Sequence, residues 1–270
     1  MQLFSNMLLA PQLEIDYENL PSAAITDIFS EEQLKAIYLL CLRVDIKNNN
    51  LKADILKELV PEGFDEIGTG TNRMAFLYNG YVFKIALDRR GMADNLAEFK
   101  RSAELPTFLA KTYETNLLIN LCEYVTIIDK EDFLANSDQI RRILKEISKA
   151  YLFDDIGVTT KNYCNWGSRT NGGRETLVIL DYGYLYPLFG QNTDELFRCP
   201  RCGSRLKWNV NFTEFVCSGN DGSERCSARV SPSVLRDAMK KDFDAAEDKV
   251  LQEVYGVPVP DLKAIEKTIT

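Results

Sequence analysis

The chain has 270 residues, of which 45% are hydrophobic and 27% are charged, and its formal net charge is −8 at pH 7. This composition is ordinary for a globular protein of one large or two small domains, and the negative charge argues against general binding to nucleic acids or anionic membranes. The sequence contains no histidine, which excludes histidine acid–base catalysis and histidine metal ligands.

The first part of the chain predicts two helices. Residues 30–44, SEEQLKAIYLLCLRV, combine a capping serine, two glutamates in the first turn and one apolar face. The stretch NNNLKADILKELVPEG predicts a second helix, which Pro61 and Gly63 end. We interpret residues 1–62 as a helical extension whose apolar face packs on the segments that follow.

A pattern of strands and tight turns follows the helices. Asn79-Gly80 separates RMAFLY from YVFKIA and predicts a two-residue hairpin turn, because both residues tolerate positive φ. With that turn, Lys84 lies opposite Ala75, close to the strand that leaves the Gly68–Gly70 loop. A glycine loop can present backbone N–H groups to phosphate oxygens, and a lysine beside it adds a positive charge.

The next part of the chain mixes helices and strands. A helix is expected near residues 93–105, and it ends before Pro106. The further predicted elements are strands at 110–115 and 117–128, a helix at 137–153 that Ser137 caps, and a hairpin at 165–183.

The second hairpin predicts a metal site at its open end. Asn165 opens one strand and Asp181 closes the other, with Asn171-Gly172-Gly173 as the turn, so the amide and the carboxylate should converge. Both groups supply oxygen ligands suited to Mg²⁺. The alternative interpretation is that Asp181-Tyr182-Gly183 is only a turn after a buried strand.

The order of these parts resembles the protein-kinase-like superfamily, which has a glycine loop, a strand lysine, a helix glutamate, a long helix, and then Asn and Asp-x-Gly around a hairpin. The resemblance covers about residues 64–190 and includes small kinase-like proteins of bacteria and phages. It implies a two-lobed α+β fold that binds ATP and Mg²⁺ and transfers phosphate to a protein or a small molecule. The N-lobe and hinge would span residues 63–128, and a shortened C-terminal lobe residues 129–197.

The resemblance also implies roles for individual residues. Four positions match groups that hold the nucleotide: Gly68 and Gly70 in the covering loop, Lys84 at the phosphates, and Glu98 on the helix that pairs with this lysine. Glu104 is the fallback partner, and segment 122–128 falls where the hinge would hold adenine. Asn165 and Asp181 match the two Mg²⁺ ligands. The third glycine of the loop is missing, and Arg73 stands near its place.

The chain departs from the family pattern at the catalytic aspartate. The position five residues before Asn165 is Thr160, and a shortened loop would place Asn162 there instead, so neither alignment supplies a carboxylate. Asp154 or Asp155 could substitute, and we take Asp155 and Asn162 as catalytic candidates. The alternatives are an inactive pseudokinase that binds a partner and a selenoprotein-O-like enzyme that transfers AMP.

Four cysteines near the C-terminus have the spacing of a zinc ribbon: Cys199 and Cys202 in a CPRC knuckle, then Cys217 and Cys226. Their closed shell predicts a structural Zn²⁺ rather than a catalytic one. Residues 198–229 contain six basic and three acidic side chains, so this module is either a structural staple or a contact for a protein or nucleic acid. Residues 231–270 predict about two helices, and the module spans 198–230.

The sequence also bears on the compartment. The N-terminus has no basic flank, and no apolar run reaches membrane-spanning length, so we expect a cytoplasmic protein without a signal peptide or a membrane contact. Clustering of four of the seven cysteines at metal-ligand spacing fits a reducing compartment better than disulfides do.

Overall fold

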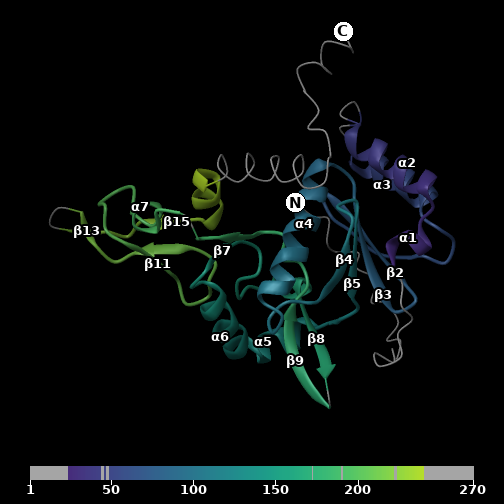
Figure 1. The fold of residues 1–270 in the computed structure, drawn as a ribbon. Helices are drawn as coiled ribbons and strands as arrows, with labels where there is room; N and C mark the ends of the chain where they lie inside the picture. Colours follow the sequence, from purple (N-terminus) through teal and green to yellow (C-terminus); the bar gives the residue numbers. More distant parts are fainter. Residues whose placement is uncertain are drawn as a thin grey trace, which may run out of the picture. The chain divides into compact units, whose positions relative to one another are not determined.

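The computed structural model describes residues 24–43, 46, 49–171, 173–189, 191–221 and 224–239. Over these residues the chain is a mixed α+β protein with antiparallel sheets (Figure 1). It divides into two compact units, which we call the first unit (Met1–Ile147 with Asp155–Leu185) and the second unit (Ser148–Asp154 with Tyr186–Thr270). The beginning of the predicted helical extension and most of the predicted C-terminal helices lie outside the described residues. None of the described helices has the length and apolar character needed to cross a membrane.

The two predicted N-terminal helices are confirmed. Helix α1 (Ile25–Ile28) precedes α2 (Glu31–Leu42) and α3 (Asn49–Leu59). Helix α2 begins with a capping box, in which the Ser30 hydroxyl accepts from the Gln33 backbone N–H and the Gln33 side chain accepts from the Ser30 N–H. The reciprocal bonds satisfy two amide groups that would otherwise have no partner at the start of the helix.

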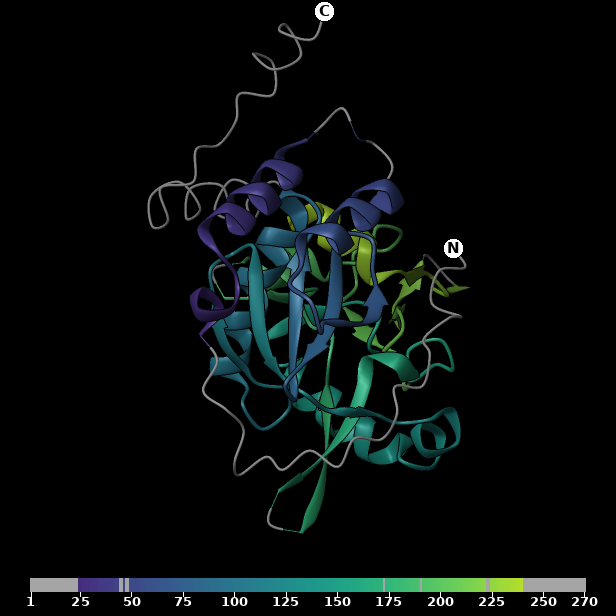
Figure 2. The same cartoon turned by 90° about the vertical axis from the view of Figure 1, so that its right-hand side faces the viewer.

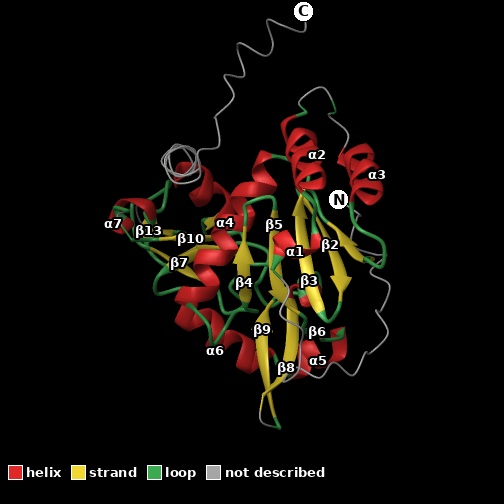
Figure 3. Cartoon of the chain, turned by 45° about the vertical axis from the view of Figure 1, so that its right-hand side comes forward, coloured by secondary structure: helices red, strands yellow, loops and turns green. Residues whose placement is uncertain are grey.

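A five-stranded antiparallel sheet forms the body of the first unit (Figure 3). Its order is β1 (Asp65–Thr69), β2 (Arg73–Tyr78), β3 (Tyr81–Ala86), β5 (Ile119–Glu123) and β4 (Thr112–Thr115). The predicted hairpin register is confirmed, since Lys84 pairs with Ala75. The turn residues Asn79 and Gly80 have φ values of 48° and 79°, which both residue types adopt at low cost.

Helix α4 (Arg89–Glu104) packs against β3, β4 and β5 of this sheet. It begins four residues before the predicted start because Asp88 caps it, accepting from the Gly91 N–H at 2.8 Å. Gly91 suits this place, since an added Cβ would lie 2.2 Å from the Asn72 carbonyl oxygen. The helix buries polar residues as well as apolar ones, and Glu98 is fully buried.

The rest of the first unit holds the second hairpin. Strands β6 (Thr126–Ile127), β8 (Trp166–Asn171) and β9 (Arg174–Ile179) form a sheet in the order β6-β8-β9, and the 3₁₀ turn η1 (Tyr163–Asn165) leads into β8. Figures 1 and 2 show the β8–β9 hairpin extending away from the five-stranded sheet. The predicted hairpin is confirmed, but Asn171 pairs with Arg174 as the last residue of β8, so it belongs to the strand and not to the turn.

Two predictions in this region are wrong in part. The predicted helix at 137–153 is α6 (Ser137–Ile147), and the residues after it form strand β7 (Tyr151–Phe153), which pairs with β10 (Leu185–Pro187). The buried face of α6 ends at Ile147, and β7 instead buries every side chain. The sequence analysis also missed helix α5 (Lys130–Ala135), and the predicted strand at 117–128 is divided into β5 and β6.

The second unit contains short strands and a cluster of aromatic rings. Its elements are α7 (Thr193–Leu196), a three-stranded sheet of β11 (Leu206–Trp208), β12 (Phe215–Cys217) and β15 (Arg229–Val230), and the pair β13 (Asn220–Asp221) and β14 (Glu224–Arg225). The Trp208 ring stacks on Phe153 with centroids 4.7 Å apart and lies 3.9 Å from Phe215. Residues 232–239 are helical. The stacked aromatic rings bury apolar area that short strands need for stability.

Candidate functional site

A buried ion pair links the five-stranded sheet to α4. Lys84 Nζ on β3 donates to both carboxylate oxygens of Glu98 at 2.9 Å and to the Leu180 carbonyl oxygen at 2.7 Å. The Glu98 side chain is 0% exposed and the Lys84 side chain is 16% exposed. Glu104, the fallback partner, instead lies at the surface near Arg101. The structure therefore pairs Lys84 with Glu98.

Arg73 joins the same network from the start of β2. Its Nη2 donates to Glu98 Oε1 at 3.0 Å and to Asp181 Oδ1 at 3.0 Å, and its Nη1 lies 2.9 Å from Glu98 Oε2. One guanidinium thus connects the helix carboxylate with the carboxylate that follows β9. The sequence analysis noted Arg73 only as a replacement for a glycine and missed this role, because its partners lie 25 and 108 residues away.

The network changes the protonation of its members. Burial raises the pKa of Glu98, but Arg73 and Lys84 outweigh that effect and lower the pKa to about 2. The neighbouring Asp94 carboxyl has a raised pKa, because its burial outweighs the nearby Arg73 and Arg90. Burial likewise raises the pKa of the Tyr182 hydroxyl well above its ordinary value. Glu98 is therefore ionised at every pH at which the protein is expected to work.

Asn165 and Asp181 stand at the open end of the β8–β9 hairpin, as expected from the sequence. The adjoining residues Trp166 and Ile179 are paired, and the Leu180 N–H donates to the Asn165 carbonyl oxygen at 2.8 Å. The Asn165 side-chain nitrogen donates to the Asp155 carbonyl oxygen at 2.7 Å, and Asn165 Oδ1 accepts from the Cys164 thiol at 3.7 Å. Oδ1 is the atom of this amide that is suited to a cation.

Asp181-Tyr182-Gly183 is more than a turn after a strand. Asp181 accepts from Arg73, and the Tyr182 hydroxyl is hydrogen-bonded to the Ala110 carbonyl oxygen and to Thr112. At Gly183 an added Cβ would lie 3.2 Å from the Asp94 Cβ, so a larger residue would crowd α4. The segment is held on three sides, which fixes the Asp181 backbone next to Lys84 and Glu98.

The two loop glycines lie near the end of β1 and in the turn that follows it. Gly68 belongs to β1 and pairs with Ala75 beside a β-bulge, and the Gly70 N–H donates to the Arg73 carbonyl oxygen at 2.8 Å. The connection between β1 and β2 is thus a short turn that uses the Gly70 N–H internally.

The catalytic candidates fall in different environments. The Asn162 side-chain nitrogen donates to the Gly157 carbonyl oxygen at 3.0 Å, so this amide serves its own loop. Asp155 is exposed, and its backbone carbonyl oxygen accepts from the Asn165 side chain. Burial, together with the nearby Asp181 and Asp155 carboxylates, raises the pKa of the Cys164 thiol. Asp154 belongs to the second unit, where it lies 3.7 Å from Arg236.

A cluster of buried apolar side chains adjoins Lys84 on the same face of the sheet. Val82 and Lys84 are two positions apart on β3, and they pair with Leu77 and Ala75 of β2. All four side chains therefore point to one face of the sheet. Cys122 pairs with Val82, and Leu77, Val82, Cys122 and Tyr124 form a cluster against which the partly buried Ile67 and Ala75 pack. The sequence predicts only segment 122–128 for this cluster. Because side chains alternate along a strand, counting by two from Lys84 would also have identified Val82 and the residues paired with it.

The four cysteines of residues 198–230, which we call the four-cysteine module, come together in the second unit. Their Sγ atoms all lie within 4.8 Å of one another, with Cys202 and Cys217 3.4 Å apart and Cys199 and Cys226 3.8 Å apart. Thiolates about 2.3 Å from a tetrahedral zinc ion are about 3.8 Å from each other. The cluster could therefore hold one Zn²⁺.

Backbone N–H groups donate hydrogen bonds to two of the four cysteine sulfur atoms. The Arg201 N–H donates to Cys199 Sγ and the Gly219 N–H to Cys217 Sγ, each at 3.4 Å. Hydrogen bonds with Ser204 lower the pKa of the Cys202 thiol to about 6. A thiolate is thus available to a metal ion near neutral pH.

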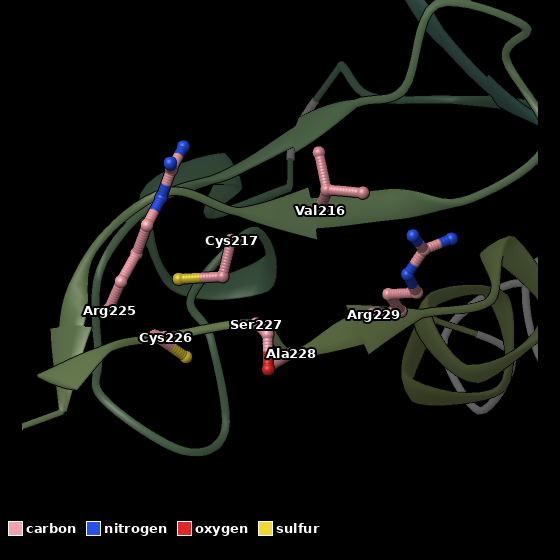
Figure 4. A pocket seen from close by; sticks show the side chains of 7 residues that line it. All are labelled: Val216, Cys217, Arg225, Cys226, Ser227, Ala228 and Arg229. Carbon is pink, nitrogen blue, oxygen red and sulfur yellow. The ribbon is translucent and has the colours of Figure 1, made fainter.

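A pocket of about 400 Å³ lies beside two of the cysteines (Figure 4). Its lining includes Arg225, Arg229, Ser227 and Val216. Val216 of β12 pairs with Lys207 of β11 and with Arg229 of β15, so these three side chains share one face of the sheet. The buried Phe215 side chain lies on the opposite face. The Arg229 guanidinium is paired with Glu214, so the local positive charge is partly neutralised.

A scan of the sequence against protein-family models finds no match, and a search of curated proteins finds none either. The function of the chain therefore has to be inferred from its own residues and their geometry.

Proposed function

We propose that the chain is an Mg·ATP-binding phosphotransferase of the protein-kinase-like type, acting on a protein or a small molecule. The observation that carries the proposal is the buried Lys84–Glu98 ion pair, with Asp181 joined to the same network through Arg73. In protein kinases a strand lysine must pair with a helix glutamate while an aspartate holds Mg²⁺. In this proposal residues 63–128 form the nucleotide lobe and hinge, and residues 129–197 the second lobe.

The chain supplies a group for each part of the ligand. Ile67 and Ala75 are the partly buried side chains packed against the apolar cluster of Val82 and Cys122, where a flat heterocycle could contact them. Lys84 lies on the same face, where it could hold phosphate oxygens. Carboxylate and amide oxygens of Asp181 and Asn165 suit Mg²⁺. When bound, Mg·ATP supplies the phosphoryl group, and the residues of the chain hold it and neutralise its charge.

The proposal is tested by thermal unfolding with and without Mg·ATP. A ligand bound only by the folded state adds about 2.7 kcal/mol at one hundred times Kd, so the wild-type midpoint should rise by several degrees. Asp181→Asn and Lys84→Ala should each lose this shift. Glu104→Gln is the matched control, because that carboxylate lies at the surface of the same unit, and it should keep the shift. No shift in the wild type would refute nucleotide binding.

Asp155 is the best candidate for the missing base, because its carbonyl oxygen holds the Asn165 amide. Asp155→Asn should lower transfer about 100-fold or more while Mg·ATP binding is kept, since a positioned general base contributes about 10²–10⁴-fold. Its neighbour Asp154 lies in the second unit, so Asp154→Asn is a control that should change transfer little. Equal rates for both variants would remove Asp155 from the mechanism. ATP labelled at the α- or γ-phosphate distinguishes AMP transfer from phosphate transfer.

One observation favours a second candidate function, a pseudokinase that binds nucleotide without transferring it. Thr160 and Asn162 supply no carboxylate, and the Asn162 amide is bonded within its own loop. In that case the four-cysteine module is the candidate contact for a protein or nucleic-acid partner. Persistent Mg·ATP binding with no label transferred to any protein or small molecule would favour this function over the first.

A further inference from the structure

Arg73 is paired with Asp181, the carboxylate to which the proposed function assigns a metal ion. Its Nη2 lies 3.0 Å from Asp181 Oδ1, while the same guanidinium contacts both oxygens of Glu98. The Arg73 side chain is 12% exposed and the Asp181 side chain 41% exposed, so the pair is only partly shielded from water. Asp181 therefore already has a cationic partner on the side that faces Glu98.

Arg73 is the second cation paired with Glu98, which already has Lys84 as a partner. Lys84 by itself donates to both oxygens of Glu98. The guanidinium also donates to the Asn95 side-chain oxygen at 3.4 Å, so it keeps anchors on α4 when one contact is lost. Among its carboxylate partners, Asp181 is the more exposed one and belongs to a segment outside α4, which makes that contact the easier one to exchange.

We propose that Arg73 is a positioning residue that competes with a divalent cation for Asp181. Without metal, Arg73 holds the carboxylate toward Glu98, and Mg²⁺ has to displace the guanidinium to bind Asp181. The displaced guanidinium stays on Glu98 beside Lys84, where nucleotide phosphates would give it a replacement anion. Metal and nucleotide would then bind cooperatively. Metal binding releases the guanidinium from Asp181, and the nucleotide phosphates stabilise the released guanidinium. This inference rests on the proposed function for the metal site.

The test is a titration with Mn²⁺ alone, with free ion measured by electron paramagnetic resonance. Arg73→Met removes the charge and keeps much of the length, and it should bind Mn²⁺ about fivefold more tightly than the wild type, as expected for loss of a partly exposed ion pair. Arg90→Met is the matched control: Arg90 lies 3.3 Å from Asp94, so its loss removes the same charge from an ion pair with Asp94. The control should gain less than about twofold.

Unchanged or weaker Mn²⁺ binding by Arg73→Met, or an equal gain in Arg90→Met, would overturn the inference. If Arg73→Met does not fold, Arg73→Lys serves instead, because a lysine keeps the charge but cannot span both carboxylates, and it should also gain Mn²⁺ affinity. The titration contains no nucleotide. A gain in Mn²⁺ affinity without any Mg·ATP shift in the wild type would uphold the competition and reject the proposed function, whereas the reverse result would reject only the competition.

Discussion

Cys202→Ser should remove the metal from the four-cysteine module and unfold it. Structural zinc sites of this kind contribute about 10–16 kcal/mol of apparent binding free energy at neutral pH, and that free energy drives folding. The module's sheet has strands of only two or three residues, which cannot sustain a fold alone. The loss should therefore be nearly complete rather than gradual.

The measurement combines metal analysis with near-ultraviolet circular dichroism. Wild-type protein should carry about one zinc per chain, and Cys202→Ser well under half of that. The Trp208 ring stacks on Phe153 in the second unit, so unfolding of the module should reduce the aromatic signal. Cys164→Ser is the control, since this thiol lies in the first unit outside the cluster, and it should keep both zinc and signal.

Two results would contradict a structural zinc. One is a Cys202→Ser protein that keeps a full equivalent of zinc, which would mean that the metal lies elsewhere. The other is wild-type protein that is folded and free of metal after purification in zinc-containing buffer. The thiol geometry argues against both, since pairs of sulfur atoms 3.4 and 3.8 Å apart are already close to tetrahedral spacing.

Local signals in the sequence were sufficient for the parts of the fold that short-range geometry determines. The Asn79-Gly80 turn determined the β2–β3 register, because positive φ at both positions and a side-chain period of two allow one pairing. The four cysteines were predicted as metal ligands from their spacing, which can also be read directly from the sequence. Glu98 was predicted from the resemblance to the kinase-like order of parts, with Glu104 as the fallback, and the structure places Glu98 on the buried face of α4.

Long-range contacts were not accessible in this way. Arg73 reads as an ordinary polar residue at a strand start, and only the fold brings Asp181 to it from 108 residues away. Asp154 and Asp155 look equivalent as neighbours, yet they belong to different compact units. The residues after Ile147 continued a helical pattern, but tertiary packing of β7 beside Trp208 outweighed that local preference.

Glu98→Gln should be the most damaging single substitution in the first unit. It keeps the shape of the side chain but removes the charge that Arg73 and Lys84 share, leaving two largely buried cations with fewer anionic partners. Breaking a buried pair in this way costs about 3–5 kcal/mol. Glu104→Gln on the same helix should change stability by less than about 0.5 kcal/mol, because that carboxylate is 51% exposed. Urea unfolding measures both differences.

The pH dependence of this difference identifies its cause. Folding lowers the Glu98 pKa from 4.5 to about 2, so the ionised carboxylate stabilises the folded state fully above about pH 5. That contribution, about 3 kcal/mol from the size of the shift, disappears as the pH falls from about 4.5 toward 2, because the unfolded chain takes up the proton first. The stability gap between wild type and Glu98→Gln should therefore shrink between pH 5 and pH 3, whereas a gap caused by altered packing alone would stay constant. A constant gap would mean that the negative charge of Glu98 does not cause the loss of stability, and the case for a preformed lysine–glutamate pair at a phosphate site would fail with it.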